Sequence, residues 1–444
     1  MLEILRERTF RRLFGAQVVA LVGTGLATVA LALLAYDLAG AQAGSVLGTA
    51  LAIKMVVYVT LAPLAGATVP PRLRKAVLIG LDLVRAAAAL MLPFVTEIWQ
   101  VYVLIALLQS ASACFTPLFQ SLIPEILPEE RDYTRALSLS RLAYDLESLL
   151  SPAIAAALLT MISFHGLFAG TSAGFIASAL LVMATTFPVV HAARAAGSPY
   201  ARALRGMRIY LHTPRLRGLL ALNLCAAAGG AMVFVNTVVI VRGPLQGGER
   251  EVAWALAAFG AGSMAVALLL PKLLERIQDR SVMLGAASVM VGALFAATGL
   301  WAATQGRLGW ALLIPLWCVL GAAYAGLVTP GGRLLRRSAQ ADDLPFLFAA
   351  QFSLSHVCWL LAYPLAGWVG AAIGLGSALV ALSCVAVLGL FVAWRAWPCH
   401  DPDVVEHSHP ELSDDHPHLV DHQVLEGKHM HPYRIDELHG RWPQ

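Results

Sequence analysis

Charged residues are scarce in this chain, at 13% of 444 residues, where a soluble domain has about a quarter. Hydrophobic residues make up 58% of the chain, and the mean hydropathy is +0.71. This composition excludes an ordinary soluble or nucleic-acid-binding protein. It indicates a chain that lies in a lipid bilayer.

Cysteines are also few, and none of the six forms a C-x-x-C pair. Five of them lie in apolar segments, which is typical of small buried side chains and not of disulfides or zinc ligands. The chain lacks a P-loop, a G-x-S-x-G motif and an H-E-x-x-H motif. We therefore expect no enzyme activity and no bound cofactor.

Long apolar segments fill most of the first 400 residues, and each has about the 20 residues that a membrane-spanning helix needs. We predict twelve spans, at 13–36, 45–67, 76–95, 98–122, 137–161, 166–188, 215–241, 251–271, 281–303, 308–330, 345–369 and 372–395. A polar break separates six spans from six, which predicts an all-α membrane protein with two six-helix halves. The predicted parts are residues 1–190, a cytoplasmic linker at 191–214, residues 215–398 and a disordered tail at 399–444.

Lysine and arginine are distributed unevenly over the loops between the spans. If the N-terminus is cytoplasmic, the loops on the opposite side contain only Arg242, Arg250 and Arg307. The positive-inside rule therefore places both termini, and the tail, in the cytoplasm. The linker stretch ARALRGMRIYLH is either a basic helix on the membrane surface or a solvated connection.

The two halves share a weak internal repeat. The tripeptide SLS begins at Ser138 in the fifth span and at Ser353 in the eleventh. A Thr-Pro pair closes the fourth span at 116–117 and the tenth at 329–330. Matching positions in two halves are expected of transporters with parallel repeats, in which the substrate path lies between the halves.

Ionisable residues within the spans require an explanation, because placing one at a helix centre costs about 2.5–3.5 kcal/mol. Arg141, Asp145 and Glu147 all lie in the fifth span. Arg141 and Asp145 are four residues apart and can pair on one helix face, so Asp145 is either neutralised or part of a site. Glu147 lacks a local partner. Because apolar surroundings disfavour an ionised carboxyl group, Glu147 is the candidate for exchanging a proton or a cation.

His356 occupies the position in the eleventh span that corresponds to Arg141 in the repeat. It is either a hydrogen-bonded packing residue or a ligand that meets Asp145 and Glu147 across the two halves. In the second case the three side chains would bind a borderline divalent cation. The other predicted path residues of this span are Gln351 and Tyr363.

Three further charged positions lie in the second and third spans. Asp82 and Arg85 are three residues apart, which predicts an ion pair that locks the inner gate. Lys54 has no nearby partner in the sequence. It either extends toward the membrane surface or pairs with an acidic residue of another helix.

The last forty-five residues contain nine of the thirteen histidines. Three pairs have H-x-H spacing, which in an extended chain places both rings on one side. The predicted metal ligands are His407, His409, His416, His418, His422, His429, His431 and His439. Imidazoles among acidic residues suit Ni²⁺, Co²⁺ or Zn²⁺, and a flexible tail predicts weak, polyvalent sites. The alternative is a solvated or pH-sensitive tail without metal.

The twelve spans, the basic loop that leads into GLDLVRA and the segment SLSRLAYDLESLLSP resemble the major facilitator superfamily. The segment QFSLSHVCWLLAYPLAGW and the tail ending in RIDELHGRWP are similar to a branch with enterobactin-exporter-like proteins and bacterial nickel-resistance exporters. The resemblance implies alternating access in a bacterial inner membrane. One departure is the loop after the second span, where Pro70 and Pro71 replace the usual Asp-Arg pair. This favours a gate rebuilt around Asp82 and Arg85.

Three functions are open at this point. The leading hypothesis is a monomeric exporter of a divalent transition metal, Ni²⁺ or Co²⁺, driven by proton antiport. The second is an exporter of an organic molecule such as a siderophore or drug, with the tail as an accessory. The third is a membrane metal sensor that binds metal without transporting it.

Overall fold

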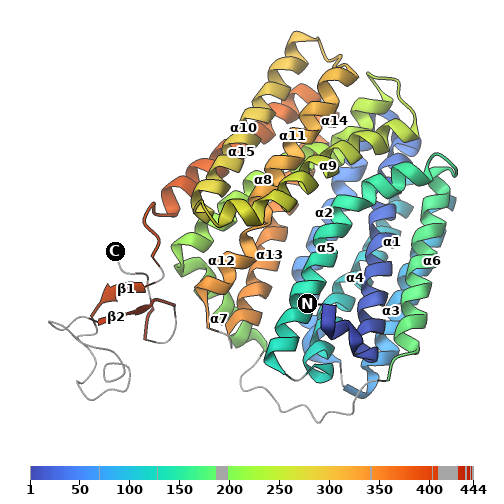
Figure 1. The fold of residues 1–444 in the computed structure, drawn as a ribbon. Helices are drawn as coiled ribbons and strands as arrows, with labels where there is room; N and C mark the ends of the chain where they lie inside the picture. The colour runs from blue at the N-terminus through green and yellow to red at the C-terminus, as the bar shows by residue number, and fades with distance from the viewer. Residues whose placement is uncertain are drawn as a thin grey trace.

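The computed structural model describes residues 2–69, 71–127, 129–186, 199–340, 343–402, 404–408, 429–435, 438–440 and 442. Within the helices, some side chains also lie outside the description, among them those of Arg141 and Asp145. The described chain is mostly helical, with one small sheet beside the helices (Figure 1).

Long helices occur at all twelve predicted spans. Those of the N-terminal half are α1 (Arg8–Ala39), α2 (Ala43–Thr68), α3 (Arg74–Met91), α4 (Ile98–Ile126), α5 (Glu130–Leu158) and α6 (Phe164–Met183). Those of the C-terminal half are α8 (Pro214–Arg242), α9 (Glu249–Leu274), α10 (Asp279–Ala303), α11 (Trp310–Val328), α13 (Leu344–Pro364) and α15 (Leu375–Ala396). These apolar segments form helices because lipid offers no hydrogen-bond partners. A helix pairs the backbone N–H and C=O groups of the segment with one another.

Short elements connect the long helices. They are η1 (Leu2–Arg6), η2 (Gly40–Gln42), η3 (Pro71–Leu73), η4 (Leu92–Phe94), α7 (Pro199–His212), α12 (Gly331–Ser338), the π-helical turn η6 (Leu365–Val369) and α14 (Gly370–Ala372). By length and composition, ten segments of the described residues can cross a membrane. The first of these, Arg8–Leu61, includes α1 and most of α2.

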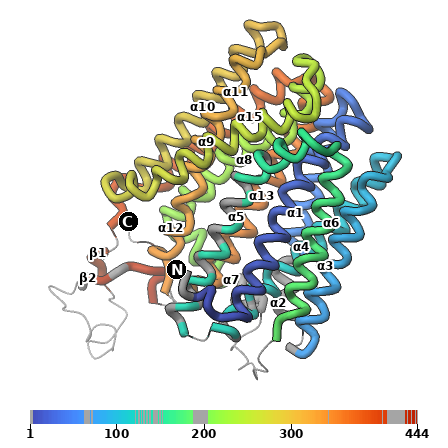
Figure 2. Tube along the Cα trace, turned by 45° about the vertical axis from the view of Figure 1, so that its right-hand side comes forward, coloured from blue at the N-terminus to red at the C-terminus, as the bar shows by residue number. Residues whose placement is uncertain are grey.

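The two halves lie side by side, with α2 packed against α13 and α5 packed against α9 (Figures 1 and 2). Because each half has an even number of long helices, the start of α1, the linker helix α7 and the end of α15 share one end of the bundle. We call this the inner end, following the predicted orientation, and the opposite one the outer end. The largest apolar cluster of buried residues extends through both halves, and two smaller clusters lie in the N-terminal half.

The linker stretch forms the helix α7, which packs against α13, and its position on a membrane surface stays a prediction. The guanidinium of Arg205 lies 2.6 Å from the carboxylate of Asp343. The hydroxyl of Tyr210 donates a hydrogen bond to Oε1 of Gln351. Burial, with a smaller effect from Cys358, raises the pKa of Tyr210 well above its usual range, so the hydroxyl keeps its proton for this bond.

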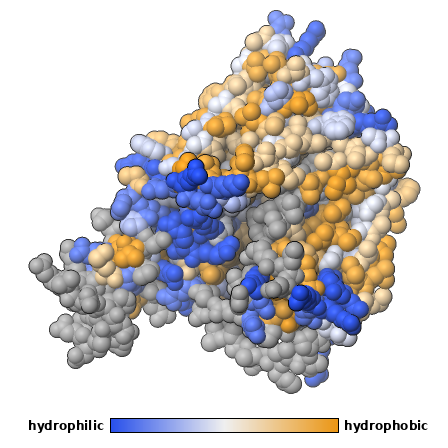
Figure 3. Space-filling view, in the orientation of Figure 1, coloured by the Kyte–Doolittle hydropathy of each residue, from blue (hydrophilic) through white to orange (hydrophobic). Residues whose placement is uncertain are grey.

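The tail contains a two-stranded sheet, which the expectation of a disordered tail did not include. Strand β1 (Val404–His407) pairs antiparallel with β2 (His429–Pro432). Tyr433 and Ile435 follow β2 and are buried in the main apolar cluster. Polar residues gather over this end of the C-terminal half, while apolar residues cover much of the visible face of the N-terminal half (Figure 3).

Candidate functional site

Three glycines bring the two halves into backbone contact near the outer end. Gly44 and Gly48 of α2 form a G-x-x-x-G pair, a spacing that lets membrane helices approach closely. A β-carbon on Gly367 of η6 would overlap the carbonyl oxygen of Gly44. A β-carbon on Gly48 would lie 2.8 Å from the carbonyl oxygen of Tyr363. We call Gly44, Gly48 and Gly367 the glycine seam.

The C-terminal side of the glycine seam is a π-helical turn. Pro364 lacks a backbone donor, and the next five residues, Leu365–Val369, widen into this turn. Nδ2 of Asn236 in α8 donates to the carbonyl oxygen of Ala366 at 3.1 Å, which satisfies a backbone group of the turn. Nε1 of Trp368 donates to Oγ1 of Thr49 in α2 at 2.9 Å. Turns of this kind are frequent at functional sites in helices.

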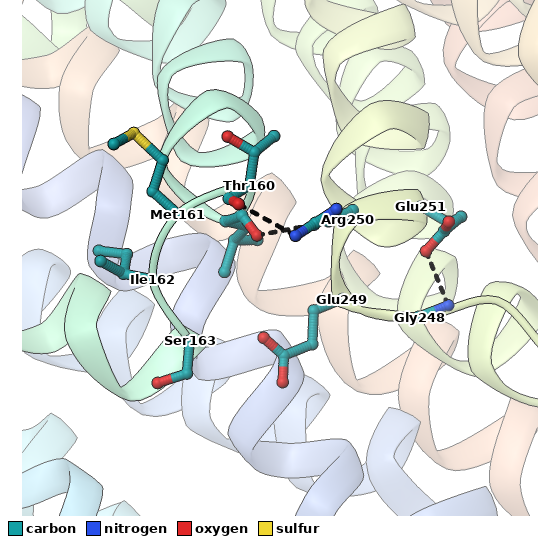
Figure 4. Close-up of a pocket in the computed structure, with 9 residues that line it drawn as sticks. Thr160, Met161, Ile162, Ser163, Gly248, Glu249, Arg250 and Glu251 are labelled. Atoms are coloured by element: carbon teal, nitrogen blue, oxygen red, sulfur yellow. Dashed lines mark hydrogen bonds between the residues drawn. The ribbon is translucent and has the colours of Figure 1, made fainter.

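Two charged residues at the start of α9 also join the halves at the outer end (Figure 4). Nε of Arg250 donates to the carbonyl oxygen of Leu159 at 3.0 Å, and Nη2 donates to that of Thr160 at 3.0 Å. The backbone N–H of Phe164 donates to Oε2 of Glu249 at 3.1 Å. The arginine thus meets the negative end of α5, and the glutamate meets the positive end of α6. We call Glu249 and Arg250 the outer clamp.

Arg250→Ala is expected to loosen the outer end. The change removes two charge-assisted hydrogen bonds between the halves, worth about 1 kcal/mol in total because Arg250 is exposed to solvent. In a chain without native cysteines, maleimide labelling of Thr49→Cys should accelerate roughly fivefold, which corresponds to about 1 kcal/mol. Arg307→Ala, in another outer loop, is the control and should leave the rate unchanged. Equal rates in both variants would show that the clamp does not hold the halves.

A pair of opposite charges lies between α2 and α5. The carboxylate of Glu147 and the ammonium of Lys54 attract each other, and both side chains are partly buried. Glu147 also lies against α1. A β-carbon on Gly25 would come within 2.9 Å of Oε1 of Glu147 and would overlap the hydroxyl of Ser151. The structure brings Lys54 within electrostatic range of Glu147, an acidic residue of another helix, and a direct ion pair between the two stays a prediction.

An aromatic contact crosses the two halves next to Lys54. The Tyr58 ring of α2 stacks on His356 of α13, with centroids 5.3 Å apart and planes 7° apart. The ring centroid of Phe352 lies 5.8 Å from that of Tyr58 and 4.0 Å from that of His356. The Lys54 ammonium lies 5.9 Å from the Tyr58 ring centroid. Nδ1 of His356 donates a hydrogen bond to the carbonyl oxygen of Phe352 at 2.6 Å, which fixes the orientation of the ring.

The remaining predicted path residues have different surroundings. Arg141 and Asp145 lie in α5, but their side chains are outside the described part, so their pairing stays a prediction. Gln351 faces the linker helix through Tyr210. Tyr363 is buried beside Trp359, with ring centroids 4.9 Å apart, and its carbonyl oxygen lies against Gly48 of the glycine seam.

The predicted gate pair is formed within the N-terminal half. The Arg85 guanidinium bonds the Asp82 carboxylate, which also accepts a 2.8 Å bond from the Ser178 hydroxyl. Cζ of Arg85 also lies over the rings of Phe115 and Phe175, at 4.1 and 4.6 Å from their centroids. All these groups belong to α3, α4 and α6. The pair therefore ties three helices of one half together, and its role at a gate stays a prediction.

The tail histidines divide into two sets. His407, His431 and His439 lie close together, with possible ligand atoms within 4.8 Å of one another. The predicted ligands outside the described side chains are His409, His416, His418, His422 and His429.

Sequence reasoning missed Tyr58, the outer clamp and the glycine seam. The G-x-x-x-G spacing of Gly44 and Gly48 was a readable signal for close packing. Tyr58 and Arg250 carried no such signal, because an aromatic residue in a span and an arginine in a loop are both common.

Comparison with known proteins gives a consistent result. The profile of the Major Facilitator Superfamily matches residues 13–243, more than half of the chain. An uncharacterised MFS-type transporter of Bacillus subtilis (strain 168), YfiS, is 24% identical over 351 residues, covering 76% of this chain and 82% of that protein. Macrolide efflux protein A of Streptococcus pyogenes is 24% identical over 184 residues, covering 40% of this chain and 45% of that protein.

Solved structures resemble the whole helical body. A bacterial homologue of the human lysosomal transporter Spinster, inward-facing and unoccupied, superposes with a TM-score of 0.66 at 12% identity, covering 88% of this chain and 96% of that one. The nucleoside transporter NupG superposes with a TM-score of 0.67 at 13% identity, covering 87% of this chain and 100% of that one. A D-xylose–proton symporter superposes with a TM-score of 0.62 at 14% identity, covering 88% of this chain and 98% of that one. At these identities the likeness concerns the fold.

Proposed function

Because the chain belongs to the Major Facilitator Superfamily, we propose that it is a secondary exporter that exchanges protons for a divalent transition metal, Ni²⁺ or Co²⁺. The observation that carries this proposal is the position of Glu147. Its carboxylate lies within electrostatic range of Lys54 in another helix, and the Lys54 ammonium is 5.9 Å from the Tyr58 ring that stacks on His356 across the halves. Ionisable residues inside membrane spans are costly and are therefore a reason to propose an ion or proton pathway there.

The proposed cycle uses the competition between Lys54, a proton and the cargo for one carboxylate. With the outer end closed, a cytoplasmic cation would displace Lys54 from Glu147, and Nε2 of His356 would supply a nitrogen donor nearby. When the glycine seam and outer clamp open, a proton would bind Glu147 and release the cation outward. With Glu147 neutral, the empty carrier would return to the state that is open to the cytoplasm. There the proton would leave Glu147.

The metal as cargo is supported by the composition of the tail and by its three clustered histidines. The test is flux in inside-out proteoliposomes with an acidic interior. We expect Ni²⁺ or Co²⁺ to accumulate inside, and the accumulation to stop when the pH gradient is removed. Absence of flux for every metal of a panel with Ni²⁺, Co²⁺, Zn²⁺ and Mn²⁺ would contradict the proposal.

A second candidate is an exporter of an organic molecule, favoured by aromatic rings in the C-terminal half. Trp359 of α13 lies 6.0 Å from Phe234, 6.2 Å from Tyr324 and 4.9 Å from Tyr363, as ring centroids. Such rings suit a large apolar cargo, and one relative is a macrolide efflux protein. Erythromycin accumulation without metal accumulation in the same vesicles would support this candidate.

A further inference from the structure

Three histidine rings of the tail converge on one point. Nε2 of His407 and Nε2 of His439 are 3.0 Å apart. The His431 ring centroid lies 4.6 Å from that of His407 and 5.0 Å from that of His439. One ligand nitrogen from each ring lies within 4.8 Å of the others. Three convergent imidazoles form a ligand set for a borderline divalent metal.

The two-stranded sheet explains how residues so far apart in sequence meet. In its register, Val405 pairs with His431, and His407 pairs with His429. His407 and His431 are therefore diagonal neighbours on the same face of the sheet. His439 reaches them from the segment after β2. The three ligands thus come from three separate places, and none of the H-x-H pairs supplies two of them.

The surroundings orient the rings as a metal site requires. Nδ1 of His407 hydrogen-bonds the carbonyl oxygen of Val405 at 3.0 Å, which directs the Nε2 lone pair toward His439. Histidine ligands of metals are commonly fixed in this way by their second nitrogen. The Tyr433 ring packs edge-on against His407 and His439, with centroids 4.8 and 4.7 Å away. His431 and His439 are buried.

The chain on both sides of the cluster is attached to the helical body. Asp401 accepts hydrogen bonds from Trp397 at 3.2 Å and from Arg215 of α8 at 3.4 Å. The Arg215 guanidinium lies 5.3 Å from the Trp442 ring centroid. A β-carbon on Gly440 would lie 3.3 Å from Nη2 of Arg208 in α7. The segment that carries His439 therefore lies against both the linker helix and α8.

We propose that His407, His431 and His439 form one fixed site for a single divalent transition metal, Ni²⁺, Co²⁺ or Zn²⁺. The bound metal fastens β1, β2 and the end of the chain to one another, and so holds the tail against α7 and α8. This inference rests on the proposed function, because it assumes that the tail binds the transported metal. The site itself lies outside the transport path. The proposal adds one built site to the weak, polyvalent binding that the sequence predicts for the tail as a whole.

The test is Co²⁺ titration of the purified full-length protein, followed by calorimetry and visible absorption. We expect one tight equivalent. His407→Ala, His431→Ala and His439→Gln should each weaken binding at least about tenfold, the usual effect of losing even a residue that only orients a ligand. His400→Ala, an exposed tail histidine outside the cluster, is the matched control. Unchanged binding in the three variants, or only weak equivalents in the wild type, would overturn the site.

A second measurement reports the fastening itself. Trypsin cleavage after Arg434, which lies between His431 and His439, should slow when Co²⁺ is added to the wild type but not to His439→Gln. Equal cleavage with and without metal in the wild type would overturn the fastening. Vesicle flux separates this inference from the proposed function. A tight three-histidine site without Ni²⁺ flux would leave the site standing, and flux with unchanged binding in the variants would leave the proposed function standing.

Discussion

Glu147→Gln is expected to lower proton-coupled flux at least about a hundredfold, which corresponds to about 2.7 kcal/mol. A glutamine has nearly the same shape, but it cannot ionise. It therefore can neither exchange a proton for cargo nor attract the Lys54 ammonium. The measurement is cargo accumulation in inside-out proteoliposomes with an acidic interior, at matched amounts of folded protein.

Two further variants make the result specific. Glu129→Gln changes an exposed carboxylate just before α5 and should transport like the wild type. Lys54→Met in the Glu147→Gln background should recover thermal stability without recovering flux, because an unpaired charge in partly buried surroundings is destabilising. Normal coupled flux in Glu147→Gln would show that this carboxylate is not the coupling group.

Gly367→Ala is expected to prevent the halves from closing at the outer end. The added β-carbon would overlap the carbonyl oxygen of Gly44, which belongs to the backbone and cannot rotate away. Overpacking of this kind typically costs about 1–3 kcal/mol. We therefore expect flux to fall at least about tenfold and maleimide labelling of Thr49→Cys to accelerate by a similar factor.

The matched control for the glycine seam is Gly292→Ala in α10. A β-carbon at Gly292 has no atom within 4 Å, so the change should leave flux and labelling unaltered. Slow labelling in Gly367→Ala, together with normal flux, would show that the helices can move apart without a loss of free energy. The glycine seam would then not be the contact that closes the outer end.

The spans could be predicted because their signal is local. A segment such as Pro214–Arg242 is apolar throughout, and in lipid it can only satisfy its backbone as a helix. The Asp82–Arg85 pair is local as well, since three residues along a helix bring two side chains to one face. Glu147 stood out in the sequence for the opposite reason, because it had no neighbour to neutralise it.

The partners of these residues could not be predicted in the same way. Lys54 comes within electrostatic range of Glu147, and Tyr58 stacks on His356, although each pair is separated by many residues and lies on different helices. In the tail, the H-x-H spacing predicted metal binding by neighbouring histidines, and this grouping stays a prediction. The described site combines His407, His431 and His439, because strand pairing and the fold after β2 decide which rings meet.

By itself, the sequence determined that this protein is a twelve-span helical membrane protein in two halves, since hydropathy acts over single segments of about 20 residues. The tertiary structure alone decided which helices touch at Gly44, Gly48 and Gly367, which charges face each other, and that three distant histidines share one point. The physical reason is that those contacts depend on close packing between segments far apart in the chain, and packing is a property of the whole fold.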